Sequence, residues 1–175
     1  NVFTNIKIFD AITPNTIKNY PKYYEKYKNQ YYNFDAKTND QLYEVRNCCL
    51  MMSHLEIVKL AKEKNYESIL IFENDFNIKN SEYIKNIKID FEYNILNIGG
   101  YYENEWLKPY TETIKKISSC NGSFAYIVNK KFYNKYIEII ESKFRNSIGY
   151  SGVDGIYFRE IYPYYDSFAF ILPLI

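Results

Sequence analysis

Two acidic residues, Glu73 and Asp75, directly follow the most hydrophobic short run of the chain, residues 68–72. A continuous run of β-branched, aliphatic and aromatic residues is typical of a buried central strand in a parallel sheet. Residues i and i+2 of an extended chain point to the same side, so both carboxylates would face the strand's carboxyl end, where open α/β sheets bind ligands. Converging carboxylates suit a hard divalent cation that carries phosphate oxygens. We therefore expect Asp75 to be a metal ligand, the alternative being a helix cap or loop acid after a core strand. Glu73 is expected to be a second ligand, directly or through water, or a contact to a ribose, the alternative being a salt-bridged strand end.

A third acidic residue, Asp154, lies in the glycine-bearing sequence of residues 151–155, which we expect to be a loop. Glycines allow a substrate to approach the backbone closely. A carboxylate at such a place can act as a general base that takes a proton from an attacking hydroxyl. Because Asp beside Gly is also ordinary turn chemistry, a purely structural role stays open.

The single histidine, His54, lies among apolar residues at helical spacing. That position is compatible with a half-buried histidine whose hydrogen bonds are satisfied within the fold, and with one that borders a ligand pocket.

Arg46, one of three arginines, could bind a diphosphate bidentately or lie on the surface. Trp106, together with Tyr101 and Tyr102, offers aromatic faces for stacking on a sugar or for packing. The absence of a G-x-S-x-G elbow argues against a serine hydrolase.

Composition narrows the class of protein. The chain has 175 residues, enough for one well-formed core, and a net charge of +1, which argues against a general nucleic-acid binder. The 21 Tyr and 12 Phe residues are favoured by AT-rich codons, and stacking platforms for sugars or bases are the alternative explanation. Three cysteines without metal-binding spacing indicate buried thiols in a reducing compartment. With no membrane-spanning run and no signal-peptide pattern, we expect a cytoplasmic protein, encoded by a parasite, a bacterium or a large virus.

The elements that must position these residues alternate along the chain. Strands are expected at residues 6–9, 68–72, 94–98, 114–118, 122–128 and 168–172, and helices at 41–65, 83–89, 130–143 and 156–161. Asn129 is placed to cap the helix that follows it. This alternation predicts an α/β fold, a single domain over residues 1–175, with a mainly parallel central sheet flanked by helices. The apolar tail offers a surface for a homodimer.

Five segments, in their order and spacing, resemble glycosyltransferase family 25, which includes lipopolysaccharide-biosynthesis and collagen galactosyltransferase-like enzymes. The segments are Phe9-Asp10-Ala11, Ser53-His54 within a helix, the strand and acidic motif of residues 69–75, the "G-x-x-AYII"-like strand of residues 122–128, and Val153-Asp154.

The resemblance implies a GT-A-like, Rossmann-type domain that moves a sugar from a nucleoside-diphosphate donor, UDP-linked, to a hydroxyl on a glycan or protein acceptor. It implies inversion at the anomeric carbon, with Asp154 as the base and Mn²⁺ or Mg²⁺ bound by Asp75 and Glu73. It also implies a set of donor-binding residues: Phe9, Asp10, Ala11, Arg46, Ser53, His54, Glu73 and Asn74.

The chain departs from the family pattern at two motifs. Arg46-Asn47 stands where the family has Gly-Glu, and Asn74, which strand alternation turns away from the two acids, replaces the middle acid of Glu-Asp-Asp. The family's first strand has no counterpart here. Either the chain is a fragment or a processed form that lacks part of the donor site, or the natural protein is no longer than this and its nucleotide binding is an open question. Two alternatives follow: a non-catalytic glycosyltransferase-like domain that binds a glycan or a partner, and a nucleotidyltransferase.

Overall fold

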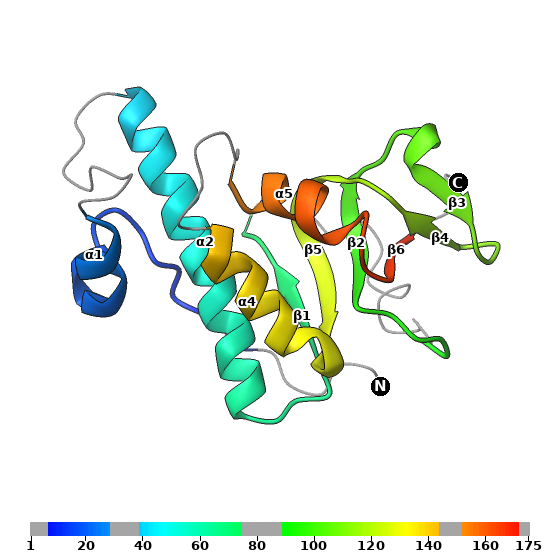
Figure 1. Cartoon of the computed structure of the whole chain (residues 1–175), viewed down its shortest axis with the longest axis horizontal. Helices are drawn as coiled ribbons and strands as arrows, with labels where there is room; N and C mark the ends of the chain where they lie inside the picture. Colours follow the sequence, from blue (N-terminus) through cyan, green and yellow to red (C-terminus); the bar gives the residue numbers. More distant parts are fainter. Residues whose placement is uncertain (1–6, 29–38, 75–88, 144–151, 172–175) are drawn as a thin grey trace.

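The computed structural model describes residues 7–28, 39–74, 89–143 and 152–171 (Figure 1). The helices are α1 (Pro21–Tyr27), α2 (Asn39–Glu63), α4 (Tyr133–Lys143) and α5 (Gly152–Ile156), with short helical turns η1 (Ile17–Asn19), η2 (Asn104–Trp106), η3 (Lys130–Phe132) and the π-helical η4 (Tyr157–Ile161). The strands are β1 (Ser68–Phe72), β2 (Ile95–Tyr101), β3 (Leu107–Pro109), β4 (Ile114–Ile117), β5 (Asn121–Asn129) and β6 (Ser167–Phe170). The mixture of helices and one sheet confirms the predicted α/β class.

The described strands form one sheet in the order β1-β5-β2-β6-β4-β3. Only the β2–β6 pair among them is parallel, and the other strand pairs are antiparallel, so the prediction of a mainly parallel sheet is wrong for this part of the chain. The physical reason lies in β5, which runs between β1 and β2 and places Ile127 opposite both Leu70 and Leu96. A continuous apolar run indicates that a strand is buried, but it does not indicate whether the neighbouring strand runs parallel or antiparallel to it.

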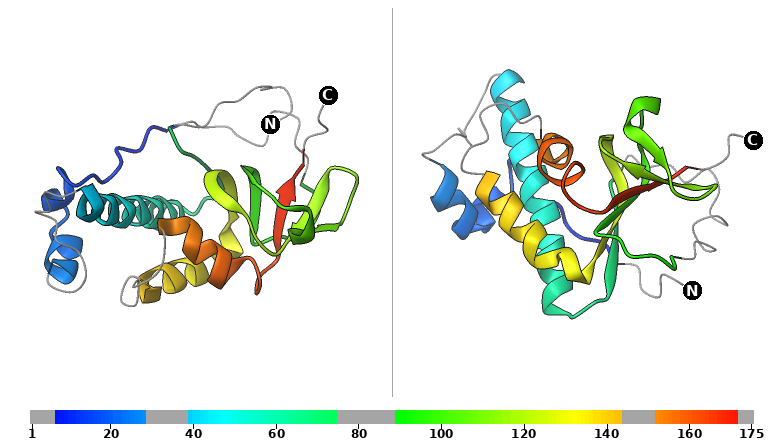
Figure 2. Two further views of the ribbon diagram at one scale, coloured as in Figure 1. Left: turned by 90° about the horizontal axis from the view of Figure 1, so that it is seen from above. Right: turned by 45° about the vertical axis from the view of Figure 1, so that its right-hand side comes forward.

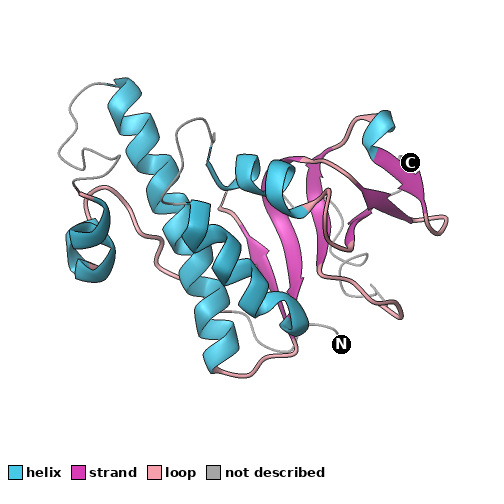
Figure 3. Ribbon diagram, viewed as in Figure 1, coloured by secondary structure: helices cyan, strands magenta, loops and turns pink. Residues whose placement is uncertain are grey.

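The helices α2, α4 and α5 lie on one side of the sheet (Figures 2 and 3). They cover a core in which the largest fully buried side chains are Tyr126, Tyr133, Tyr136, Tyr157 and Phe132. Part of the unusual tyrosine content therefore fills the core. A smaller cluster, built around Leu96, Ile127 and Phe168, lies on the opposite face of the sheet because successive strand residues alternate sides.

Several predicted elements are confirmed closely. The helix predicted at 41–65 is α2, the strand at 68–72 is β1, and the strand at 122–128 is β5. Asn129 caps the next helical segment, since its side-chain oxygen accepts a hydrogen bond of 3.0 Å from the backbone N–H of Lys131. Residues 168–170 of the predicted tail strand lie in β6, and Phe168 and Ala169 are buried within the chain itself.

Other predicted elements differ. The described residues 7–9 form no strand, and Ile8 is 94% exposed. Strand β2 continues through Gly99 and Gly100, beyond the predicted end of the strand, and its pairing with β5 shifts register there. Asp154 lies in helix α5, although its neighbouring glycines had suggested a loop; Val153 and Ile156 bury their side chains and hold this short helix against the core. The helix predicted at 83–89 falls almost entirely outside the described residues.

Candidate active site

Glu73 directly follows β1 and extends its ladder by one residue. Its backbone N–H donates a hydrogen bond of 2.9 Å to the carbonyl of Phe124. Its side-chain Oε1 lies 3.5 Å from Nε2 of His54, on helix α2. Asn74 is exposed, and Asp75 lies outside the described residues, so its role as a metal ligand stays a prediction. The carboxyl end of β1 thus meets α2 at a contact between a carboxylate and the only histidine.

His54 is buried rather than half-buried, with 3% of its surface exposed. Burial lowers the pKa of its imidazole to about 4, so the ring is neutral near pH 7. The second ring nitrogen, Nδ1, forms a hydrogen bond with the hydroxyl of Tyr126. A carboxylate only accepts hydrogen bonds, so the hydrogen of the neutral ring belongs on Nε2, facing Glu73, and Nδ1 accepts from Tyr126.

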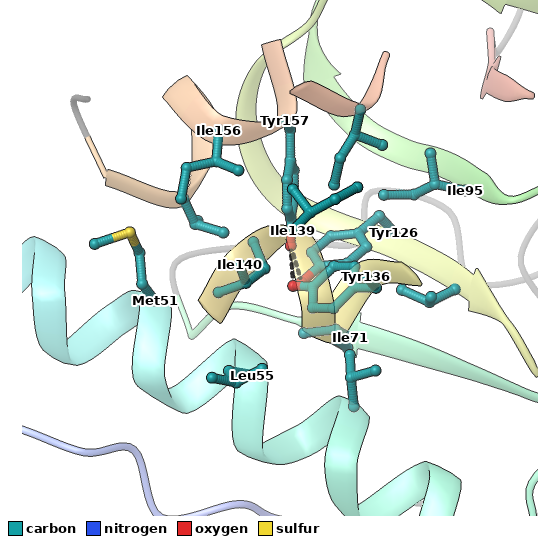
Figure 4. Close-up of a cluster of buried hydrophobic side chains, with 14 of the residues drawn as sticks. Met51, Leu55, Ile71, Ile95, Tyr126, Tyr136, Ile139, Ile140, Ile156 and Tyr157 are labelled. Atoms are coloured by element: carbon teal, nitrogen blue, oxygen red, sulfur yellow. Dashed lines mark hydrogen bonds between the residues drawn. The ribbon is translucent and has the colours of Figure 1, made fainter. Parts of the chain in front are cut away.

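Two further tyrosines, Tyr157 and Tyr136, extend the hydrogen bonding from Tyr126 into the core (Figure 4). The Tyr157 hydroxyl, on η4, donates to the Tyr126 hydroxyl at 2.7 Å, and it also forms a hydrogen bond with the Tyr136 hydroxyl on α4. All three side chains are fully buried, and burial raises the pKa of each, that of Tyr136 to about 12. Sequence reasoning missed this group. Its one signal was Tyr126, which lies inside the "G-x-x-AYII"-like segment.

Ser53 joins a second predicted segment to α2. Its buried hydroxyl accepts a hydrogen bond of 2.9 Å from the backbone N–H of Ile12 and donates one of 2.8 Å to the Cys49 carbonyl. Ile12 follows Asp10 and Ala11, which border an open hollow lined also by Thr13, Thr16, Asn19 and Tyr20. Ser53 therefore holds the end of the 9–12 segment, Ile12, against helix α2.

Arg46 and Phe9 are less tightly placed. Arg46 is exposed on α2, seven residues before Ser53, which puts it on the same helix face and about 10 Å along the axis. Phe9 is partly buried at the start of the segment that Ser53 holds. Their contacts with a donor stay predictions.

Asp154 lies on α5, which packs against α2. Burial is the main cause that raises the pKa values of Cys120 and Tyr162, and the negative charge of Asp154 adds to both shifts. Three residues later in the chain, Tyr157 enters the hydrogen-bonded group that reaches His54. The η4 segment that follows the helix of the predicted base is thus linked by hydrogen bonds to His54, which contacts Glu73.

The aromatic residues considered for stacking on a sugar differ in how far they are buried. The hydroxyl of Tyr102 is buried near Cys120, which is a packing position. Tyr101 is 71% exposed and lies edge-on to Phe124, the backbone partner of Glu73. Trp106 lies edge-on to Phe158, with ring centres 6.1 Å apart. Tyr101 and Trp106 therefore remain available for stacking.

A family model for glycosyltransferase family 25, described as an LPS biosynthesis protein, matches residues 3–151. The chain belongs to glycosyltransferase family 25. The match contains the 9–11 segment, the Ser53-His54 pair and the Glu73–Asp75 motif, whereas Asp154 lies just beyond its end. No curated protein matches the chain.

Membership in this family makes the protein a glycosyltransferase, with a sugar donor and an acceptor as substrates. Among the described residues, no group of three His, Cys, Asp or Glu side chains is arranged to hold a metal ion, and Asp75 is not among those residues. In the same part of the chain, no helix is both long enough and apolar enough to cross a membrane.

Proposed function

We propose that this glycosyltransferase transfers the sugar of a UDP-sugar to a hydroxyl of a glycan or protein acceptor, with Mn²⁺ or Mg²⁺ and with inversion. One observation carries the proposal. The 3.5 Å contact between Glu73 and His54 joins the acidic end of β1 to the helix whose Ser53 holds the 9–12 segment. Contacts of helix α2 thus link three segments of the predicted donor site that lie far apart in the sequence, and this supports the proposal.

The residues proposed as metal ligands suit Mn²⁺ or Mg²⁺. Mg²⁺ and Mn²⁺ prefer oxygen ligands, and the Glu73 side chain, 16% exposed, lies beside a neutral His54 that does not cancel its charge. Glu73, with Asp75, would hold the cation. When bound, the cation would supply Lewis-acid stabilisation of the diphosphate leaving group.

The residue proposed for proton transfer is Asp154. As the acceptor oxygen attacks the anomeric carbon, its proton passes to the Asp154 carboxylate. The bond between that carbon and the diphosphate oxygen breaks in the same displacement, and UDP leaves with the bonding electron pair. This role is supported by the partly buried position of Asp154 on α5, which packs against α2, the helix that carries His54.

Metal dependence is tested by donor hydrolysis and transfer assays with Mn²⁺ and with chelator. We expect activity to require the cation and to be lost in Asp75→Ala. Asp90→Ala is the matched control, since Asp90 is an exposed acid that precedes β2 and so lies near the opposite end of the sheet. Full activity in chelator, or in Asp75→Ala, would remove the metal role.

Product analysis separates the proposal from a nucleotidyltransferase. Transfer of the sugar releases UDP, whereas nucleotidyl transfer releases pyrophosphate. The configuration of the new glycosidic bond, read by NMR, tests inversion. A product that keeps the donor's anomeric configuration would contradict the assignment of Asp154 as the base of a single displacement.

A further inference from the structure

The hydrogen bonds around His54 have one direction. Because Tyr157 donates to the Tyr126 hydroxyl, the Tyr126 hydrogen is left to be donated to its other partner, Nδ1 of His54, and the ring hydrogen then belongs on Nε2. The Tyr126 oxygen accepts from Tyr157, and the Tyr157 oxygen is then left to accept from Tyr136. Every donor in the series Tyr136, Tyr157, Tyr126 and His54 therefore points toward Glu73.

Packing alone does not account for this series. Phenylalanine would fill the same aromatic positions without burying a hydroxyl, and buried hydroxyls are costly unless they are hydrogen-bonded. Tyr133 provides the contrast within the same core, because its buried hydroxyl has no hydrogen-bond partner among the described residues. In a low-dielectric interior, linked hydrogen bonds polarise one another in a common direction.

We propose that His54 is a positioning residue for Glu73: the hydroxyls of Tyr126, Tyr157 and Tyr136 fix its Nε2–H tautomer, and the ring directs that hydrogen at the Glu73 carboxylate. The inference rests on the proposed function, in which Glu73 meets the cation of the donor complex. Its 3.5 Å contact is longer than an ordinary N–H···O hydrogen bond, and shortening would orient the carboxylate. Groups that hold a metal-binding carboxylate in this way affect metal affinity without touching the metal.

The tautomer is tested by nitrogen NMR on tag-free protein without added metal. His54 is the only histidine, so its two ring nitrogens give the only imidazole signals of the chain. We expect one protonated nitrogen, assigned to Nε2, and one unprotonated nitrogen, Nδ1. Tyr126→Phe should shift the Nδ1 signal, and Tyr133→Phe should not. A ring protonated on Nδ1, or equal responses to the two substitutions, would overturn the proposal.

The effect on the site is tested by calorimetric titration of Mn²⁺ into protein saturated with UDP. We expect Tyr126→Phe and His54→Leu to weaken Mn²⁺ binding by about 10-fold or more, the usual size of an outer-shell effect. His54→Gln, which keeps an N–H near the position of Nε2, should retain most of the affinity, and Tyr133→Phe should keep all of it. Unchanged affinity in Tyr126→Phe, with only a loss of stability, would mean that the hydroxyl series is structural.

The two tests separate this inference from the proposed function. If the wild-type protein binds no Mn²⁺ with UDP, the proposed function fails and the donor-site role of His54 fails with it. If the wild type binds and only the NMR expectation fails, Glu73 is held by another means and the proposed function stands.

Discussion

The buried imidazole of His54 makes a specific prediction about acid stability. Its pKa is lowered from 6.5 to about 4 by burial, so between these values the unfolded chain binds a proton that the folded protein excludes. Stability must therefore fall as the pH drops through this interval, and it levels off below about 4. A shift of about 2.5 units corresponds to roughly 3 kcal/mol over the whole interval, of which about 2 kcal/mol is lost between pH 7 and pH 5.

The measurement is urea unfolding at both pH values for the wild type and for His54→Gln, which cannot titrate there. The variant supplies the reference because all other groups, such as Glu56 with its lowered pKa, remain in both proteins. Among the described residues, Glu73 from the end of β1 and Tyr126 from β5 face His54. Tyr126 stays neutral, and an ionised Glu73 favours the imidazolium, so any contribution from Glu73 makes the loss smaller.

We expect the wild type to lose about 2 kcal/mol more than His54→Gln over this range, with equal slopes against urea concentration. Equal losses in the two proteins would refute the argument, because they would mean that His54 titrates alike in the folded and unfolded chains.

Three further predictions concern other residues. Gly100→Ala should lower stability by roughly 1–3 kcal/mol, because an added Cβ would overlap the Cys120 sulfur; Cys120→Ala in the same chain should restore part of the loss in thermal unfolding. Asn129→Ala should cost about 1 kcal/mol in urea unfolding, because the Lys131 N–H loses its capping acceptor; an unchanged midpoint would argue against the cap. Asp154→Asn should abolish sugar transfer while leaving UDP affinity unchanged in calorimetry; a normal transfer rate would exclude Asp154 as the base.

Local patterns in the sequence were sufficient for the elements that frame the site. The apolar run of residues 68–72 and the helical spacing around His54 each depend on near neighbours, and both elements formed at the predicted residues. The family resemblance also selected Ser53, which the structure ties to the 9–12 segment. The contact between His54 and Glu73 followed from neither pattern, since it depends on how α2 packs against the end of β1.

The hydroxyl series lay beyond sequence reasoning for a different reason. Tyr126 and Tyr157 are two of 21 tyrosines, and nothing in their local sequence distinguishes them from those that only fill space. Their hydrogen bond links β5 to η4, so it exists only once tertiary packing has brought those elements together. The order of the strands could not be predicted for the same reason, because nothing in the local sequence of β5 shows that this strand lies between β1 and β2.

The position of β5 has a consequence for how the chain folds. Strand β1 finds its hydrogen-bonding partner far along the chain, as in the pairing of Ile69 with Val128, and β2 also pairs with β5. During synthesis, both apolar strands therefore emerge before residues 121–129 can pair with them. Long-range pairing of this kind slows folding and leaves apolar strands open to association with other chains. We expect a chain shortened before residue 121 to aggregate, and refolding yield to fall as protein concentration rises.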